Sequence, residues 1–389
     1  MTLLRFEFIK VFRKRYLVIS FLLFTLVNFA SIFLTNQGYQ PWTLEEEQNK
    51  FCIERLCGLI DQQKIDFIIA EDKRLNDTIM LQTFSRDYDP NTYTGYIFND
   101  FMLIHDNLIP NLKYAVDYAY TMRDISIRAN ENISFYQKQG NSAMVIKNRD
   151  ILKLYSNRTI SSFRNMIPAK YLLFYDFSGL LIILLLVLTL TPIFISEKEN
   201  RMNQLLTTFP LGEGKLISTK IVFIILVTAL YCSWFFLMDL MGFFLFSNLQ
   251  GLSMPLYSIH EFQITPLVLS IIQFLGLNFF LRMLGMILIA FFISLTSKFL
   301  QHVVFAFLGS LFPLILYLVW QPKLHSALHW FDFFNPMFLL KNRNLFLSYN
   351  PIVLISVPVQ PVFIVLFCVL LMLLLFAFFL KAKIPTRLV

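Results

Sequence analysis

Charged residues are scarce in this sequence of 389 residues, where they make up 15% against 57% apolar residues. A water-soluble fold of this length needs more polar side chains than that to cover its surface. The charges are also unevenly placed, because long runs of the chain carry none. These runs are residues 16–44, 177–196, 221–238, 262–281, 299–322 and 344–380. The composition therefore argues against two or three soluble domains and indicates a membrane protein.

The charge-free runs predict six membrane-spanning helices. A bilayer core of about 30 Å takes roughly 20 helical residues to cross, and peptide groups inside lipid must bond within their own segment. The first run is too long for a signal peptide and no small-x-small cleavage site follows it, so we expect a retained span. The predicted spans are residues 16–35, 171–195, 217–243, 272–296, 301–320 and 360–380. The expected fold class is an all-α polytopic membrane protein.

Basic residues predict the orientation of these spans. Lys and Arg are frequent in residues 1–15, 196–215 and 381–389, whereas the short loops on the other side hold few, such as Lys341 and Arg343 in the 321–358 loop. Because basic loops stay in the cytoplasm, we expect both termini there. The net charge of +8 follows from this asymmetry and requires no nucleic-acid partner.

Residues 36–170 differ in kind from the rest of the chain. Acidic and basic residues are nearly balanced there, as in a solvated domain, and long loops cross the membrane regardless of their charge. Apolar residues at helical spacing predict helices near residues 51–60, 108–122 and 151–160. We therefore expect a helical extracytoplasmic domain between the first and second spans.

The loop between the second and third spans carries the main functional signal. Ser196 is suited to cap a helix, with Glu199 three residues later, and Glu197 and Glu199 would lie at the positive end of the helix dipole. An apolar face follows and Pro210 ends the helix; the face consists of Met202, Leu205, Leu206 and Phe209. Such a short amphipathic helix either rests at the lipid interface or docks against a partner.

This loop resembles the coupling-helix region of the type-2 ABC exporter permease family. The resemblance is carried by Glu197, Lys198, Glu199, Leu205, Leu206, Pro210, Lys215 and Lys220. The basic amphipathic segment 1–15 resembles the family's in-plane elbow helix. Residues 321–358, with Trp330 and Asn335-Pro336, resemble its short helices that dip back from outside. The resemblance extends over all of the chain except the extracytoplasmic domain.

The resemblance implies a permease subunit that exports a cargo, weakly favoured as a peptide or amphiphile, across a bacterial plasma membrane. It assigns ATPase coupling to Glu197, Glu199, Met202, Leu205, Leu206, Phe209 and Pro210. The implied partners are a cytosolic ABC ATPase subunit and a second permease chain, identical or paralogous. Phe209 stands where a phosphate loop needs its first glycine, so we expect no cofactor in this chain. ATP and magnesium would be held by the ATPase, and this chain would not itself be an enzyme.

Three charged residues fall within or beside the apolar spans, namely Asp176, Asp239 and Arg282. Charges at such positions are costly and tend to be functional. We expect Arg282 to pair with Asp239 or, as the second choice, with Asp176. The pair would either lock helix packing or take part in gating or lining an export path.

Other polar groups give weaker signals. His325, His329 and Asp332 have a spacing that places both imidazoles on one helical face, but we interpret them as interfacial residues and predict no metal site. Cys52 and Cys57 are five residues apart, a spacing that does not suit a bridge within one helix, although a bend would allow one. Two other function classes stay open. One is a membrane-bound sensor or scaffold whose extracytoplasmic domain binds a ligand. The other is an intramembrane enzyme, which is disfavoured because the spans hold no nucleophile–base or metal cluster.

Overall fold

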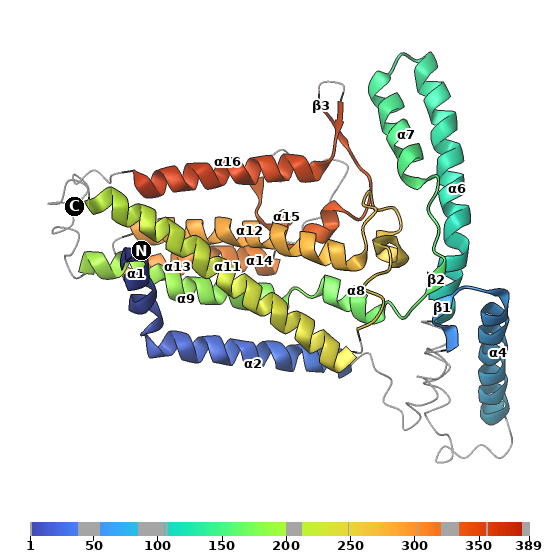
Figure 1. The fold of residues 1–389 in the computed structure, drawn as a ribbon, viewed down its shortest axis with the longest axis horizontal. Helices are drawn as coiled ribbons and strands as arrows, with labels where there is room; N and C mark the ends of the chain where they lie inside the picture. The colour runs from blue at the N-terminus through green and yellow to red at the C-terminus, as the bar shows by residue number, and fades with distance from the viewer. Residues whose placement is uncertain are drawn as a thin grey trace.

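The computed structural model describes residues 2–37, 55–84, 105, 108–199, 212–247, 249–300, 302–319, 334–354 and 357–382. Within these residues the structure is mostly helical, and each strand is two or three residues long. A long helix bundle carries a smaller group of helices at one end (Figure 1). The bundle consists of α1 (Thr2–Phe12), α2 (Arg15–Gln37), α8 (Ile167–Phe174), α9 (Phe177–Glu199), α11 (Gly212–Ser247), α12 (Ile271–Phe299), α13 (Val303–Ser310), α14 (Phe312–Val319), α15 (Met337–Leu340) and α16 (Pro361–Lys381).

Among the described residues, five segments of the bundle are long and apolar enough to cross a membrane. They are Arg15–Thr35, Ile167–Ile195, Gly214–Ser247, Ile271–Phe299 and Pro361–Lys381. Each overlaps one of the six spans predicted from the charge-free runs. The membrane-spanning helical character of the chain is thereby confirmed.

The sixth span, predicted at residues 301–320, is not confirmed. The chain there forms two short helices, α13 and α14, which meet at Leu311. Pro313 lies in the first turn of α14 and has no N–H to donate to the preceding turn, which accounts for a new helix beginning there. The apolar stretch Val304–Val319 is about 24 Å long as a helix, which is less than the roughly 30 Å of a bilayer core.

The centre of the bundle is formed by α9 and α12. In the most apolar 18-residue stretch of each segment, the buried share is 78% in Ile167–Ile195 and 61% in Ile271–Phe299. The corresponding shares are 17% in Arg15–Thr35 and 22% in Pro361–Lys381. The outer helices α2 and α16 therefore leave most of their apolar surface uncovered. Such a surface suits contact with lipid tails or with other apolar helices.

The short helix α15 inserts into the bundle beside the middle of α12. All four of its residues are buried, and Leu339 and Leu340 lie against Gly285 of α12. A side chain at Gly285 would meet Leu340 at 3.0 Å and Leu339 at 3.1 Å. The close approach of the two helices therefore depends on the missing side chain. Residues 337–345, part of the predicted 321–358 segment, thus enter the bundle.

Replacing Gly285 with Val is expected to push α15 away from α12. Overpacking of this kind lowers the free energy of unfolding by about 1–3 kcal/mol. Gly276 provides a matched control on the same helix, because no atom would lie within 4 Å of a side chain there. Thermal unfolding of the purified protein in detergent should separate the two valine variants. An equal effect of both variants would contradict the packing role of Gly285.

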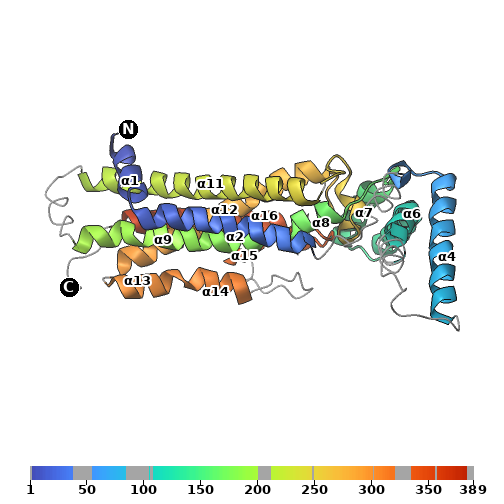
Figure 2. The same cartoon turned by 90° about the horizontal axis from the view of Figure 1, so that it is seen from below.

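The smaller group of helices lies between α2 and α8 in the chain and stands at one end of the bundle (Figures 1 and 2). It comprises β1 (Gly58–Leu59), α4 (Gln62–Phe84), α6 (Ile109–Lys138), α7 (Ser142–Tyr155) and β2 (Ser162–Phe163). We call this group the helical domain. The predicted helix at 108–122 corresponds to the first half of α6, and the one at 151–160 ends at Tyr155 in α7. The helix predicted at 51–60 is wrong in its last part, because Gly58 and Leu59 pair with β2 instead.

The helical domain is fixed to the loop between α11 and α12, which contains η2 (Leu256–Ser258) and η3 (His260–Phe262). Three successive carbonyls of this loop accept hydrogen bonds from the domain and its exit segment. The Tyr118 hydroxyl donates to the Gln263 carbonyl at 3.1 Å, and the Tyr155 hydroxyl donates to the Ile264 carbonyl at 2.7 Å. The Arg158 guanidinium donates to the Thr265 carbonyl at 2.8 Å.

Arg158 is the centre of this junction. Only 5% of the residue is exposed, and its guanidinium lies 4.8 Å from the Tyr155 ring centre and 5.1 Å from that of Tyr257. Burial raises the pKa of Tyr118 to about 12, although the nearby Arg158 opposes the rise, so the hydroxyl stays protonated and able to donate at neutral pH. We call Tyr118, Tyr155, Arg158 and Tyr257 the domain junction.

The last elements connect α15 to α16. They are η5 (Asn342–Leu345) and the hairpin of β3 (Ile352–Leu354) and β4 (Val357–Val359). The hairpin lies next to α7 (Figure 1), and just before it the Tyr349 hydroxyl donates to Asp150 of α7 at 2.9 Å. The helical domain therefore touches the bundle through two separate loops.

Candidate functional site

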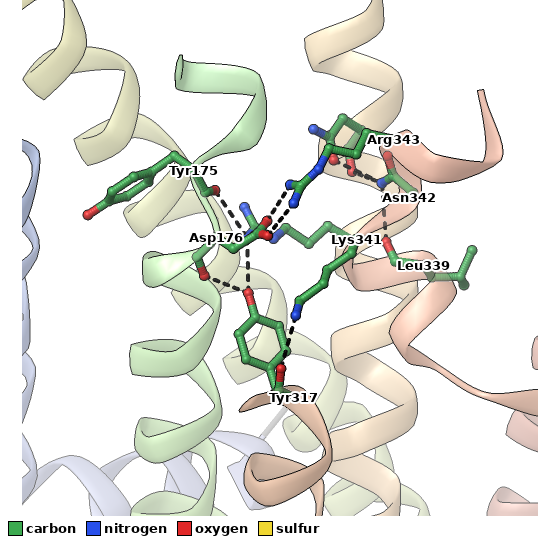
Figure 3. Close-up of polar contacts among 9 residues, drawn as sticks. Tyr175, Asp176, Tyr317, Leu339, Lys341, Asn342 and Arg343 are labelled. Carbon is green, nitrogen blue, oxygen red and sulfur yellow. Dashed lines mark hydrogen bonds and ion pairs between the residues drawn. The ribbon is translucent and has the colours of Figure 1, made fainter. Parts of the chain in front are cut away.

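The second span is interrupted at Tyr175 and Asp176. The helix α8 ends at Phe174, α9 begins at Phe177, and Tyr175 between them is extended with ψ of 109°. The single helix predicted over residues 171–195 is therefore wrong at its start. A helix end leaves backbone carbonyls without partners inside the helix, so the break supplies acceptors as well as the Asp176 carboxylate. Figure 3 shows side chains from several elements converging on this point.

Arg343 of η5 holds the Asp176 carboxylate through both of its oxygens. The two N–O distances are 2.8 Å and 2.7 Å, and the side chains of Arg343 and Asp176 are only 15% and 23% exposed. The guanidinium also lies 4.7 Å from the ring centre of Phe174. A bidentate pair of this kind is among the strongest charged contacts in proteins. It fastens η5 to the beginning of α9.

Arg282 of α12 reaches the same carboxylate less closely. Its Nη2 lies 3.5 Å from Asp176 Oδ1, 3.4 Å from the Tyr175 carbonyl and 3.5 Å from the Tyr317 hydroxyl. Its Nε is buried and has no hydrogen-bond partner among the described residues. These distances are at the outer limit for hydrogen bonds. Arg282 is thus held more loosely than Arg343.

Asp239 of α11 contacts a different element. Its side chain is buried, and Oδ1 accepts a hydrogen bond from the Asn28 amide of α2 at 2.7 Å. Asn28 accepts in turn from the Tyr175 hydroxyl at 2.9 Å. The expected ion pair of Arg282 with Asp239 is therefore wrong within the described residues. The second choice, Asp176, is the carboxylate that Arg282 approaches.

Tyr317 of α14 and Lys341 complete the set of contacts around Asp176. The Tyr317 hydroxyl donates to the Asp176 carbonyl at 2.5 Å, and Lys341 Nζ donates to the Tyr317 carbonyl at 3.1 Å. A side chain at Gly179 would overlap the Tyr317 hydroxyl, so Tyr317 takes this position against α9 because Gly179 has none. Asn342 adds a bond from its amide to Asn278 of α12 at 2.8 Å.

We call Asp176, Arg282, Lys341 and Arg343 the ionic cluster. These side chains lie around a shallow depression that has no room for a water molecule. One carboxylate here faces three cations in a partly buried position. The contacts link the start of α9 to α12, α14 and η5 (Figure 3). The Asp176 carboxylate is the common partner of these cations, so the ionic cluster holds the helices together by charge.

The predicted ATPase-coupling residues fall at the edge of the described structure. Glu197 and Glu199 lie in the last turns of α9, which runs through Ser196. The helix start predicted at Ser196 is therefore wrong, and both glutamates lie at the negative end of a helix dipole instead of the positive end. Met202, Leu205, Leu206, Phe209 and Pro210 lie outside the described residues. His325, His329, Asp332 and Cys52 also lie outside them, while Cys57, Cys232 and Cys368 are free thiols. Within the described part of the chain no group of three or more His, Cys, Asp or Glu side chains is placed to hold a metal.

Sequence reasoning missed Arg343, Tyr317 and Asn28 as partners in the site. The sequence pattern marks Arg343 and Lys341 only as basic residues of the 321–358 loop. Their one distinguishing signal is that they directly follow the apolar stretch Met337–Leu340, which the structure buries. Charges so close to a buried segment must find partners nearby.

A scan against protein-family models finds no match for this chain, and searches of curated proteins and of solved structures find none either.

Proposed function

We propose that this chain is the membrane-spanning permease subunit of an ATP-binding-cassette exporter in a bacterial plasma membrane. A separate cytosolic ATPase would bind ATP and magnesium, and a second permease chain would complete the transporter. In this proposal α13 and α14 together serve as the sixth membrane crossing. The cargo moves outward, towards the side of the helical domain.

The observation that carries this proposal is the difference between the two ends of the bundle. The amphipathic helix α1, the end of α9, the start of α11 and the end of α16 all lie at the end opposite the helical domain (Figure 1). Lys215, Lys298 and Lys381 belong to helix termini at that end. Basic residues favour the cytoplasmic side, so the connection between α9 and α11 would face an ATPase there.

The helix α9 links that connection to the ionic cluster. It begins next to Asp176, ends at Glu199 and is about 35 Å long. The helix is continuous over this length, although Pro192 inside it removes one backbone hydrogen bond and marks a place where it can bend. We propose that ATPase closure moves the end of α9, and that the ionic cluster opens and closes the outer half of the bundle in response.

The coupling segment provides a direct test. Changing Leu205 and Leu206 together to Asp is expected to abolish the ATP-hydrolysing activity that co-purifies with the tagged chain, because charges on an apolar docking face are costly to bury. Gln204→Asp is the matched control, since the same helical spacing places it on the opposite face. Hydrolysis is measured on affinity-purified membranes solubilised in mild detergent. Full retention of the activity by the double variant would refute the coupling role.

A further inference from the structure

The hairpin of β3 and β4 is an apolar projection at the start of α16. Its strands are antiparallel and three residues long each, and the only polar side chain between positions 351 and 359 is Ser356. Even so, Val353 is 40% exposed and Val357 is 55% exposed. A two-stranded hairpin of this size is marginally stable in water, so these exposed valines favour apolar surroundings.

The helical domain covers one side of the hairpin. The strand β4 lies against α7, and the Tyr349 hydroxyl before β3 donates to Asp150 of α7 at 2.9 Å. Both β3 and α7 run across the direction of α16 and extend past it (Figure 1). The side of the hairpin that faces away from α7 therefore borders the space beside α16.

The surface of α16 in this space is suited to lipid. Four exposed apolar residues form one stripe at helical spacing, namely Phe363, Phe367, Leu370 and Leu374. The helix packs against α12 and α11, so the stripe faces away from the bundle. Only Gln360 lies between the end of β4 and the start of this membrane-spanning segment. The exposed apolar surface thus continues from the hairpin onto α16.

Two features place the hairpin at the lipid interface rather than in the hydrocarbon. A two-stranded hairpin has two edges with unpaired backbone groups, which hydrocarbon cannot satisfy but water and lipid head groups can. The helix beside it is basic, because α7 contains Lys147, Arg149 and Lys153 against Asp150 alone. Arg149 and Lys153 are exposed, and such side chains are attracted to lipid phosphates.

We propose that the β3–β4 hairpin inserts Val353 and Val357 into the lipid interface at the end of the bundle that carries the helical domain. Its partner is the bilayer, with the first acyl carbons against the valines and the phosphates near the basic residues of α7. The hairpin then holds α7 along the membrane surface, as an attachment additional to the domain junction. This role requires a membrane-spanning chain but not the export function.

Spin-label accessibility of the full chain in nanodiscs of phosphatidylethanolamine and phosphatidylglycerol tests the proposal. A nitroxide is attached through a ketone-bearing amino acid introduced at Val357. Power saturation compares its collisions with oxygen, which concentrates in lipid, and with a water-soluble nickel chelate. The matched control is Ile69, which is 56% exposed on α4, far from the bundle (Figures 1 and 2). We expect several-fold fewer nickel collisions and more oxygen collisions at Val357 than at Ile69.

Hydrogen exchange of a second variant guards against distortion by the label. Val357→Asp places a charge where the proposal puts lipid, so the hairpin should leave the interface. Amides of β4 and α7 should then exchange several-fold faster than in the unchanged protein in the same nanodiscs. Ile69→Asp should leave the exchange of α7 unchanged.

Three results would overturn the proposal. Equal access of the nickel chelate to Val357 and Ile69 would place the hairpin in water. Protection of Val357 from both reagents would show that a protein surface, such as a second permease chain, covers it. Unchanged exchange of α7 in Val357→Asp would exclude the attachment. Each of these leaves the permease proposal standing, because that proposal depends on the co-purifying ATPase.

Discussion

Replacing Asp176 with Asn is expected to lower the free energy of unfolding by about 3 kcal/mol, because breaking a largely buried ion pair leaves uncompensated charge. The variant would leave Arg282, Lys341 and Arg343 close together without their shared carboxylate. Repulsion among the cations should also loosen η5 from α9. Reversible unfolding in mixed detergent micelles measures the stability change, and hydrogen exchange of residues 337–345 measures the loosening.

Glu71→Gln is the matched control for Asp176→Asn. Glu71 pairs with Arg74 on the same helix, where the Arg74 side chain is 58% exposed. Exposed pairs contribute about 1 kcal/mol or less. If Asp176→Asn destabilises the protein no more than Glu71→Gln does, the ionic cluster does not hold α9, α12, α14 and η5 together.

Replacing Arg158 with Met is expected to free the helical domain from the loop before α12. The change removes the hydrogen bond to the Thr265 carbonyl and both ring contacts, with a loss of about 2 kcal/mol for the charged hydrogen bond alone. Amides of α6 and α7 should then exchange faster, and limited proteolysis should release this part of the chain.

Arg128→Met on the exposed side of α6 is the control for the Arg158 substitution. Both variants lose one guanidinium from the same part of the chain, but only Arg158 belongs to the domain junction. Identical exchange and proteolysis patterns in the two variants would show that the junction does not depend on Arg158.

The membrane-spanning segments could be predicted from the sequence because absence of charge over roughly 20 residues is a local property. The interruption of the second span at Tyr175 could not, since nothing in the apolar composition on either side of Asp176 marks a helix end. The break at Leu311 has a local signal in Pro313, although the absence of charge over residues 301–320 predicts one continuous span.

Which buried charges meet depends on the orientation of each helix about its own axis in the packed bundle. The spacing of residues along the chain does not determine that orientation. Arg282 was expected to reach Asp239, yet Asp239 faces Asn28 of α2 and Arg282 faces Asp176. The bond between Asp176 and Arg343 joins residues 167 positions apart. Such a pair forms only after η5 has entered the bundle, and no local pattern predicts it.

The most direct test of the permease assignment is purification of the tagged chain from its native membrane, followed by measurement of ATP hydrolysis. The assignment predicts a second polypeptide in constant ratio to the permease, with a hydrolysis rate that rises when the pair is placed in lipid nanodiscs. Recovery of the chain alone, without any nucleotide-hydrolysing partner, would contradict it and would favour a membrane-bound sensor or scaffold.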